Sequence, residues 1–157
     1  MTQTIQTNGV AVPDQIEIER TFPVPPERVW TALTDPGELA RWFGTAAEVD
    51  LRPGGALRFV FGTSWDVSGV IEVIEPPRRL VYAWEADADV ASGPGTPPMT
   101  RVEFVLDPIP DGTRLRVVES GFGALPASIR RSSRDGRVTG WTREMDHLVA
   151  YVTGEGD

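Results

Sequence analysis

The sequence contains no cysteine and one histidine, His147. The first absence excludes disulfide bonds, thiol catalysis and thiolate metal sites, and the second leaves no group of imidazole ligands for a metal ion. No apolar run approaches the roughly 20 residues needed to cross a bilayer, and the N-terminus lacks the pattern of a secretion signal. We therefore expect a cytoplasmic protein with no metal or other cofactor and no membrane insertion.

Positive charge is also scarce, because 15 basic residues stand against 23 acidic ones and the formal net charge is −8. Such a surface repels a phosphate backbone, so nucleic acid is not an expected partner. Five tryptophans and six phenylalanines are present in the 157 residues, a length that suits one domain. Aromatic side chains are therefore the residues most available for binding in this sequence.

The spacing of apolar residues predicts one strand, two short helices, a series of strands and a final long helix. Alternation predicts the first strand over residues 16–22, and helical spacing predicts short helices around residues 29–33 and 36–43, the second capped by Asp35. Further strands are predicted at residues 48–51, 57–61, 65–74, 80–86, 100–107 and 113–119. The last helix is predicted to begin near Ser132 or Ser133 and to end near Thr153.

This order of elements predicts a two-layer α+β domain, in which an antiparallel sheet is covered on one face by a single long helix. Residues 15–154 are expected to form that single domain, and residues 1–14 a flexible N-terminal tail. Residues 87–98, rich in glycine and proline, predict a long hairpin loop.

Six short motifs in this order resemble one protein family. They are the proline-ended strand and helix of residues 22–36, Leu39-Ala40-Arg41-Trp42-Phe43, Pro53-Gly54-Gly55, residues 74–84, Glu119-Ser120-Gly121-Phe122 and Gly140-Trp141. Together they are similar to the activator of heat-shock protein 90 ATPase homologue family, within the START-like or SRPBCC (helix-grip) superfamily. The resemblance covers residues 15–153. It implies a curved antiparallel sheet of about seven strands around the C-terminal helix, with two short helices after the first strand and a hydrophobic cavity between sheet and helix.

The superfamily includes lipid carriers, plant hormone receptors, polyketide cyclases and aromatases, so membership alone does not decide the function. The co-chaperone for which the family is named has an additional N-terminal domain, whereas about 15 residues precede the resemblance here. A chaperone partner is therefore a less favoured expectation.

Alternation places the apolar residues of five strands on one face of the sheet, opposite the apolar face of the last helix. The same pattern fits a filled core or an apolar chamber for a small organic molecule. Aromatic walls would offer stacking area, and tryptophan and tyrosine one hydrogen bond each. The candidate ligand-binding residues are Trp42, Phe43, Phe59, Phe61, Trp65, Tyr82, Trp84, Phe104, Glu119, Trp141 and Met145.

Two charged residues, Arg20 and Glu119, share the parity of inward-facing residues on their strands. Because burying either charge alone would cost several kcal/mol, we predict an Arg20–Glu119 ion pair if both are inside. The Tyr82 hydroxyl is expected either to orient a ligand or to bond to the backbone.

The remaining polar candidates are interpreted as surface. His147 lies at the edge of the helical apolar face, and no nearby spacing supplies it with a partner for general-base catalysis. Four arginines, Arg130, Arg131, Arg134 and Arg137, are interpreted as a solvated cluster, with the rim of an entrance for an anionic ligand as the alternative.

These observations favour binding of a small hydrophobic ligand by a monomer or homodimer, with no catalytic residue. No Gly-x-Ser-x-Gly motif, cysteine nucleophile or phosphate-binding loop occurs in the sequence. Two alternatives stay open, namely a cyclase, aromatase or dehydratase, and a protein-interaction module related to the chaperone activator.

Overall fold

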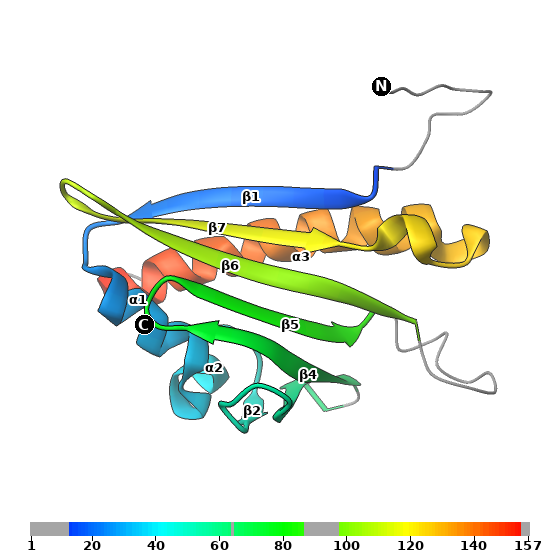
Figure 1. Cartoon of the computed structure of the whole chain (residues 1–157), viewed down its shortest axis with the longest axis horizontal. Helices are drawn as coiled ribbons and strands as arrows, with labels where there is room; N and C mark the ends of the chain where they lie inside the picture. Colours follow the sequence, from blue (N-terminus) through cyan, green and yellow to red (C-terminus); the bar gives the residue numbers. More distant parts are fainter. Residues whose placement is uncertain (1–12, 64, 87–97, 155–157) are drawn as a thin grey trace.

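The computed structural model describes residues 13–63, 65–86 and 98–154, without the side chain of Trp65. A curved antiparallel sheet of seven strands, in the order β1-β7-β6-β5-β4-β3-β2, lies against a long C-terminal helix (Figure 1). The strands are β1 (Gln15–Phe22), β2 (Ala46–Val49), β3 (Ala56–Phe61), β4 (Trp65–Glu75), β5 (Arg79–Glu85), β6 (Met99–Ile109) and β7 (Gly112–Ser120). The helix-grip fold expected from the sequence is confirmed.

Strands β2 to β7 form a meander in which sequence neighbours pair, and β1 is the exception. β1 pairs with β7 over its whole length, from Gln15 opposite Ser120 to Phe22 opposite Thr113. The two backbones meet closely at Gly112, where an added Cβ would lie 1.8 Å from the carbonyl oxygen of Phe22. Glycine at this position therefore allows β1 to close one edge of the meander.

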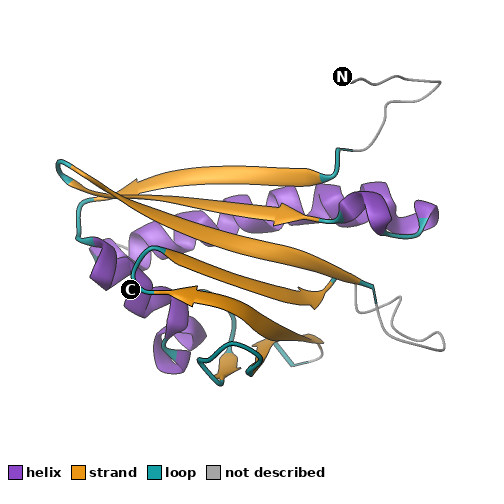
Figure 2. Ribbon diagram, viewed as in Figure 1, coloured by secondary structure: helices purple, strands orange, loops and turns teal. Residues whose placement is uncertain are grey.

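Two short helices, α1 (Pro26–Thr34) and α2 (Pro36–Trp42), follow β1 as expected. Asp35 caps α2, because its carboxylate accepts a hydrogen bond of 3.0 Å from the backbone N–H of Glu38. The Trp42 indole donates to the carbonyl of Ala32 at 2.8 Å, which fixes α2 against α1. This helix pair lies at one end of the sheet, beside the C-terminal end of the long helix (Figure 2).

The long helix α3 (Ala127–Thr153) begins earlier than predicted, directly after the short 3₁₀ turn η2 (Phe122–Ala124) and Pro126. The expected start at Ser132 or Ser133 is wrong. The backbone N–H groups of Ile129 and Arg130 bond to the Pro126 carbonyl, and the Arg130 guanidinium bonds to the carbonyl of Leu125 at 3.0 Å. A proline start thus replaces the serine cap that the sequence suggested.

The C-terminal end of α3 is fastened to both short helices. Glu38 of α2 accepts a hydrogen bond of 2.7 Å from Arg28 of α1 and one of 2.9 Å from the Tyr151 hydroxyl of α3. The neighbouring Glu38 carboxylate raises the pKa of Arg28, and burial followed by the bond to Glu38 raises the pKa of Tyr151. Three helices therefore meet at one carboxylate.

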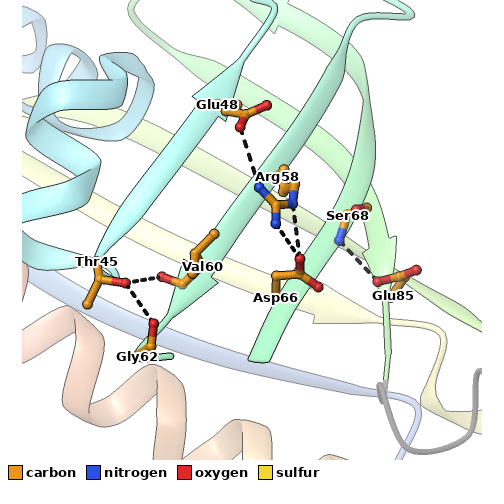
Figure 3. Close-up of polar contacts among 8 residues, drawn as sticks. All are labelled: Thr45, Glu48, Arg58, Val60, Gly62, Asp66, Ser68 and Glu85. Atoms are coloured by element: carbon orange, nitrogen blue, oxygen red, sulfur yellow. Dashed lines mark hydrogen bonds and ion pairs between the residues drawn. The ribbon is translucent and has the colours of Figure 1, made fainter. Parts of the chain in front are cut away.

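The outer face of the sheet bears cross-strand ion pairs. Figure 3 shows Arg58 of β3 between Glu48 of β2 and Asp66 of β4, with N···O distances of 3.4 and 2.6 Å. Arg101 of β6 reaches Glu72 of β4 at 2.7 Å. Each exposed pair contributes little to stability, but together they give the outer face balanced charge.

The predicted tail over residues 1–14 and the predicted loop over residues 87–98 lie almost entirely outside the described residues. Asp14 is described, and its carboxylate accepts a hydrogen bond of 2.9 Å from the backbone N–H of Gly123.

Replacing Asp35 tests the cap of α2. We expect Asp35→Ala to lower the free energy of unfolding by about 1 kcal/mol, because the N–H of Glu38 loses its partner. Asp35→Asn, which keeps a capping oxygen, should lose much less. Urea unfolding measures both, and equal losses in the two variants would contradict the capping role.

Candidate ligand-binding site

Three aromatic rings from distant parts of the chain stack between the sheet and α3. Phe43 follows α2, Trp84 lies on β5 and Trp141 on α3. The Phe43 ring centroid is 6.1 Å from that of Trp84 and 5.6 Å from that of Trp141, with interplanar angles of 13° and 18°. The two indole rings are 5.8 Å apart. We call these residues the stacked trio, and their geometry is that of offset stacking.

The other predicted wall residues surround the stacked trio. Phe59 and Phe104 make edge contacts with Phe43 and Trp141 at 5.0 and 5.7 Å, and the Tyr82 ring lies 5.3 Å from that of Trp84. Most of the predicted wall residues lie together on this side of the sheet. Trp42, Phe43, Phe59, Tyr82, Trp84, Phe104, Glu119, Trp141 and Met145 are buried, Phe61 is half-buried, and the side chain of Trp65 lies outside the described residues.

Glu119 is a fully buried carboxylate at one edge of the stacked trio, and donors from three other elements bond to it. Its Oε1 accepts from the Trp141 indole at 2.8 Å, and its Oε2 accepts from the Trp84 indole at 3.0 Å and the Thr100 hydroxyl at 2.5 Å. Arg137 of α3 completes the set with an ion pair to Oε2. Four donors match the roughly four lone-pair sites of a carboxylate, so Glu119 is saturated and poorly suited to act as a general base.

The Arg137 guanidinium closes this network on the side of β5. A second nitrogen, Nη2, donates to the carbonyls of Glu85 and Ala86 at 3.0 and 2.7 Å. Its Cζ lies 4.7 Å from the Trp84 ring centroid, which adds a cation–π contact. Arg137 thereby ties α3 to the end of β5 while it compensates the buried charge of Glu119.

The predicted Arg20–Glu119 pair is wrong. Arg20 does face α3, but it pairs with Asp146 at 3.0 Å. In the sheet register Arg20 lies opposite Leu115, four positions along β7 from Glu119, a separation of about 13 Å. The parity of both residues was right, but parity carries no information about distance along a strand.

The surface interpretation of the arginine cluster also needs correction, because Arg130, Arg134 and above all Arg137 are half-buried. Arg137, Trp141 and Met145 are spaced four residues apart, which is about one helical turn. This spacing places Arg137 on the same, buried face of α3 as the other two residues. Thr100 shares the parity of Val102 and Phe104 on β6 in the same way. Both signals were present in the sequence.

His147 is exposed, as predicted, but it does have a partner. Its Nδ1 lies 3.1 Å from the Glu144 carboxylate, one turn earlier on the same helix. His147 lies toward solvent, whereas the Glu144 side chain is half-buried beside the face that bears Met145.

The Tyr82 hydroxyl has no hydrogen-bond partner among the described residues. Burial raises the pKa of Tyr82 well above its ordinary value of 10.0, and the nearby Glu119 charge raises it further. The phenol therefore stays a neutral donor at physiological pH.

The two hollows that described residues line at this site are small. Two hollows border Tyr82 and Phe59, and each has a volume of about 10 Å³, close to the space that one water molecule needs. Around these two hollows, the described side chains thus fill most of the predicted chamber.

The described residues offer neither a metal-binding group nor a membrane-spanning helix. That part of the chain contains no group of three or more histidine, cysteine or acidic side chains able to hold a metal ion. It likewise contains no helix long and apolar enough to span a membrane.

The chain is similar to a known protein family over most of its length. Residues 23–153 match the family described as Activator of Hsp90 ATPase homolog 1-like protein. The chain belongs to this family. An uncharacterised protein of Schizosaccharomyces pombe is 28% identical over 64% of the chain, but the match spans only 28% of that longer protein.

Several solved structures share this fold, and their names point to different functions. Protein MLL2253 from Mesorhizobium loti superposes with a TM-score of 0.77 and 25% identity, covering 88% of this chain and 96% of that one. DynU16, from the dynemicin biosynthetic locus, superposes with a TM-score of 0.73 and 25% identity. The match covers 90% of this chain and 48% of DynU16. An HSP90 activator from Plasmodium falciparum superposes with a TM-score of 0.71 and 24% identity, over 90% of this chain and 97% of that one. This similarity shows the shared fold alone.

The buried ion pair of this family member can be tested by removing its cation. We expect Arg137→Met to lower the free energy of unfolding by roughly 3–5 kcal/mol, because Glu119 is left buried without its counter-charge. Arg143→Met, on the exposed side of the same helix, should change it by less than about 0.5 kcal/mol. Combining Arg137→Met with Glu119→Gln should cost less than the sum of the single changes. Additive losses would contradict the pairing.

The environment of Tyr82 predicts a loss of stability in alkali. Below about pH 10 the phenol is protonated in both the folded and the unfolded chain, so its contribution does not vary there. Above that pH the unfolded chain releases the proton first, because the folded pKa is raised, and the stability falls. Chemical unfolding at about pH 9 and about pH 11 should show a smaller fall in Tyr82→Phe than in the wild type. An equal fall in both would refute a raised pKa for Tyr82.

Proposed function

We propose that this domain binds a small hydrophobic molecule between the inner face of the sheet and α3. The observation on which this rests is the stacked trio of Phe43, Trp84 and Trp141 beside the saturated carboxylate of Glu119. Pockets for small organic ligands combine aromatic walls with a few fixed polar groups in this way.

Compensated charge makes the site suitable for an apolar guest. Glu119 and Arg137 neutralise each other, and both indole N–H groups are already bonded to Glu119. A ligand therefore meets ring faces without having to satisfy a buried charge, and its affinity comes from stacking and from apolar area removed from water.

Phe43 supplies the room that the ligand needs. It comes from the segment after α2 and is held by ring contacts, whereas the indoles of Trp84 and Trp141 are hydrogen-bonded to Glu119. Because the hollows hold about one water each, a ligand must displace at least one ring, and Phe43 is the ring of the trio that lies just outside a regular element. Binding is expected to shift a closed state to an open one, which lowers the apparent affinity.

Membership of the family and similarity to DynU16, from a biosynthetic locus, support a small-molecule role for this chain. The fold itself is shared by proteins of several functions, so the ring geometry supports the proposal more directly.

The proposal is tested by titrating the protein with the neutral fluorescent probe N-phenyl-1-naphthylamine. We expect saturable binding of one molecule to the wild type. Phe43→Leu should bind the probe several-fold more tightly, because less ring surface has to be displaced. Phe122→Leu, the same change at a buried ring outside the stacked trio, controls for general loosening and should leave the affinity unchanged.

Failure of this experiment has a clear form. If the wild type shows no saturable binding, and native mass spectrometry of protein purified from its own host finds no retained small molecule, the proposal is wrong. If Val70→Ser, at an exposed apolar residue of the outer face, abolishes binding, the probe binds the surface and the inner site is refuted.

A second candidate is a protein-interaction module that acts through its surface. The small size of the hollows favours it, because a filled interior needs no guest. The family name then points to the ATPase of the host's Hsp90 chaperone as the activity to measure. Stimulation of that ATPase by the purified protein, without probe binding, would support this candidate over the first.

A further inference from the structure

One hollow lies beneath the short helices and opens beside the β2–β3 hairpin. Its described lining combines Leu33 and Leu39 of the helices with Val49 and Leu57 of the hairpin strands, and it reaches Tyr82 on β5. Leu51, which lies between β2 and β3, also lines it and is 44% exposed. The mouth of the hollow is therefore at Leu51, and Tyr82 is a buried part of its wall.

The Tyr82 hydroxyl borders this free space without a partner. Among the described residues, Nε of Arg134 is the side-chain polar atom that is both fully enclosed and without a hydrogen bond. The Tyr82 hydroxyl is therefore not fully enclosed by protein atoms. The Tyr82 hydroxyl has no partner in the described part of the chain, so it must touch free space. Because the residue is only 3% exposed and lines both hollows, that space is inside the protein.

Water is a poor partner for this hydroxyl. Buried water molecules usually make about three hydrogen bonds. In the described lining of the hollow that opens at Leu51, the polar residues are Tyr82 and Thr34, and Thr34 already donates to the carbonyl of Trp30 at 2.8 Å. A buried hydroxyl without a partner is costly, so the site favours a guest that brings an acceptor with it.

The charge of the guest is restricted as well. Neither hollow has a charged residue in its described lining, and the nearest buried charges, Glu119 and Arg137, are paired with each other. An anion would lose its hydration without gaining a cation, and a cation would meet no free carboxylate. An uncharged acceptor has neither cost.

On the basis of the ligand-binding function proposed above, we infer that the site takes an uncharged molecule with an apolar body and one oxygen acceptor, of the ketone, ester or ether class. The acceptor bonds to the Tyr82 hydroxyl, and the molecule enters between α2 and the β2–β3 hairpin, past Leu51. Tyr82 is then the residue that selects an oxygenated ligand over a hydrocarbon of the same shape.

Three probes of similar shape test this selection: 1-indanone, which has a carbonyl acceptor, indane, which has none, and indane-1-carboxylate, which is anionic. Dissociation constants are measured with the full chain by titration followed in ¹H–¹⁵N NMR spectra. The wild type should prefer 1-indanone to indane by about fivefold, the value of one ordinary hydrogen bond, and should not prefer the carboxylate to indane.

Tyr82→Phe keeps the ring and removes the hydroxyl, so it should abolish the preference for 1-indanone and leave the affinity for indane unchanged. Tyr151→Phe is the matched control, because Tyr151 is the other tyrosine of the chain and its hydroxyl bonds to Glu38. The preference should persist in that variant.

The outcomes separate this inference from the function on which it rests. Equal binding of 1-indanone and indane by the wild type, or a preference that survives Tyr82→Phe, would overturn the role of Tyr82 while ligand binding itself stands. Preferred binding of the carboxylate would overturn the uncharged class. Absence of binding by all three probes, together with absence of N-phenyl-1-naphthylamine binding, would overturn both proposals.

Discussion

The burial of one carboxylate, Glu119, constrains more of this structure than any other interaction. A buried charge is tolerated only when it is paired and hydrogen-bonded, and here the donors come from β5, β6 and α3 while Glu119 itself belongs to β7. Four elements must therefore be in place together before the charge is satisfied. The same bonds orient both indole rings of the stacked trio, so the polar network determines the geometry of the aromatic one.

The division of the molecule into a fixed part and an adjustable part follows from this network. Trp84 and Trp141 are held by Glu119, whereas Phe43 is held by ring contacts after a short helix. Tyr82 lies between these parts with a hydroxyl that no described residue uses. Functional sites commonly keep such unsatisfied groups within a rigid support, and here the support is the sheet.

Most of the architecture could be predicted from local patterns, because strands that face a core on one side alternate and helices repeat with their own period. Alternation placed Glu119, Tyr82 and Trp84 on the inner face correctly. Alternation could not exclude Arg20 as the partner of Glu119, because the register of β1 against β7 depends on contacts across about 100 residues. The start of α3 was missed because serines after Pro126 imitate a cap. The small size of the hollows depends on side-chain packing, which no sequence period reports.

The pairing of β1 with β7 has a consequence for synthesis. β1 is made first, but the strand that it must join ends at Ser120, and α3, on which its buried face packs, follows that strand. Throughout translation of the meander, β1 therefore has no partner for its backbone or for its apolar side chains. Closing so long a loop is slow relative to forming hairpins between neighbouring strands. An unpaired strand with an apolar face, here Ile16 and Phe22, can associate with other chains, and so it is a segment that a chaperone at the ribosome would protect.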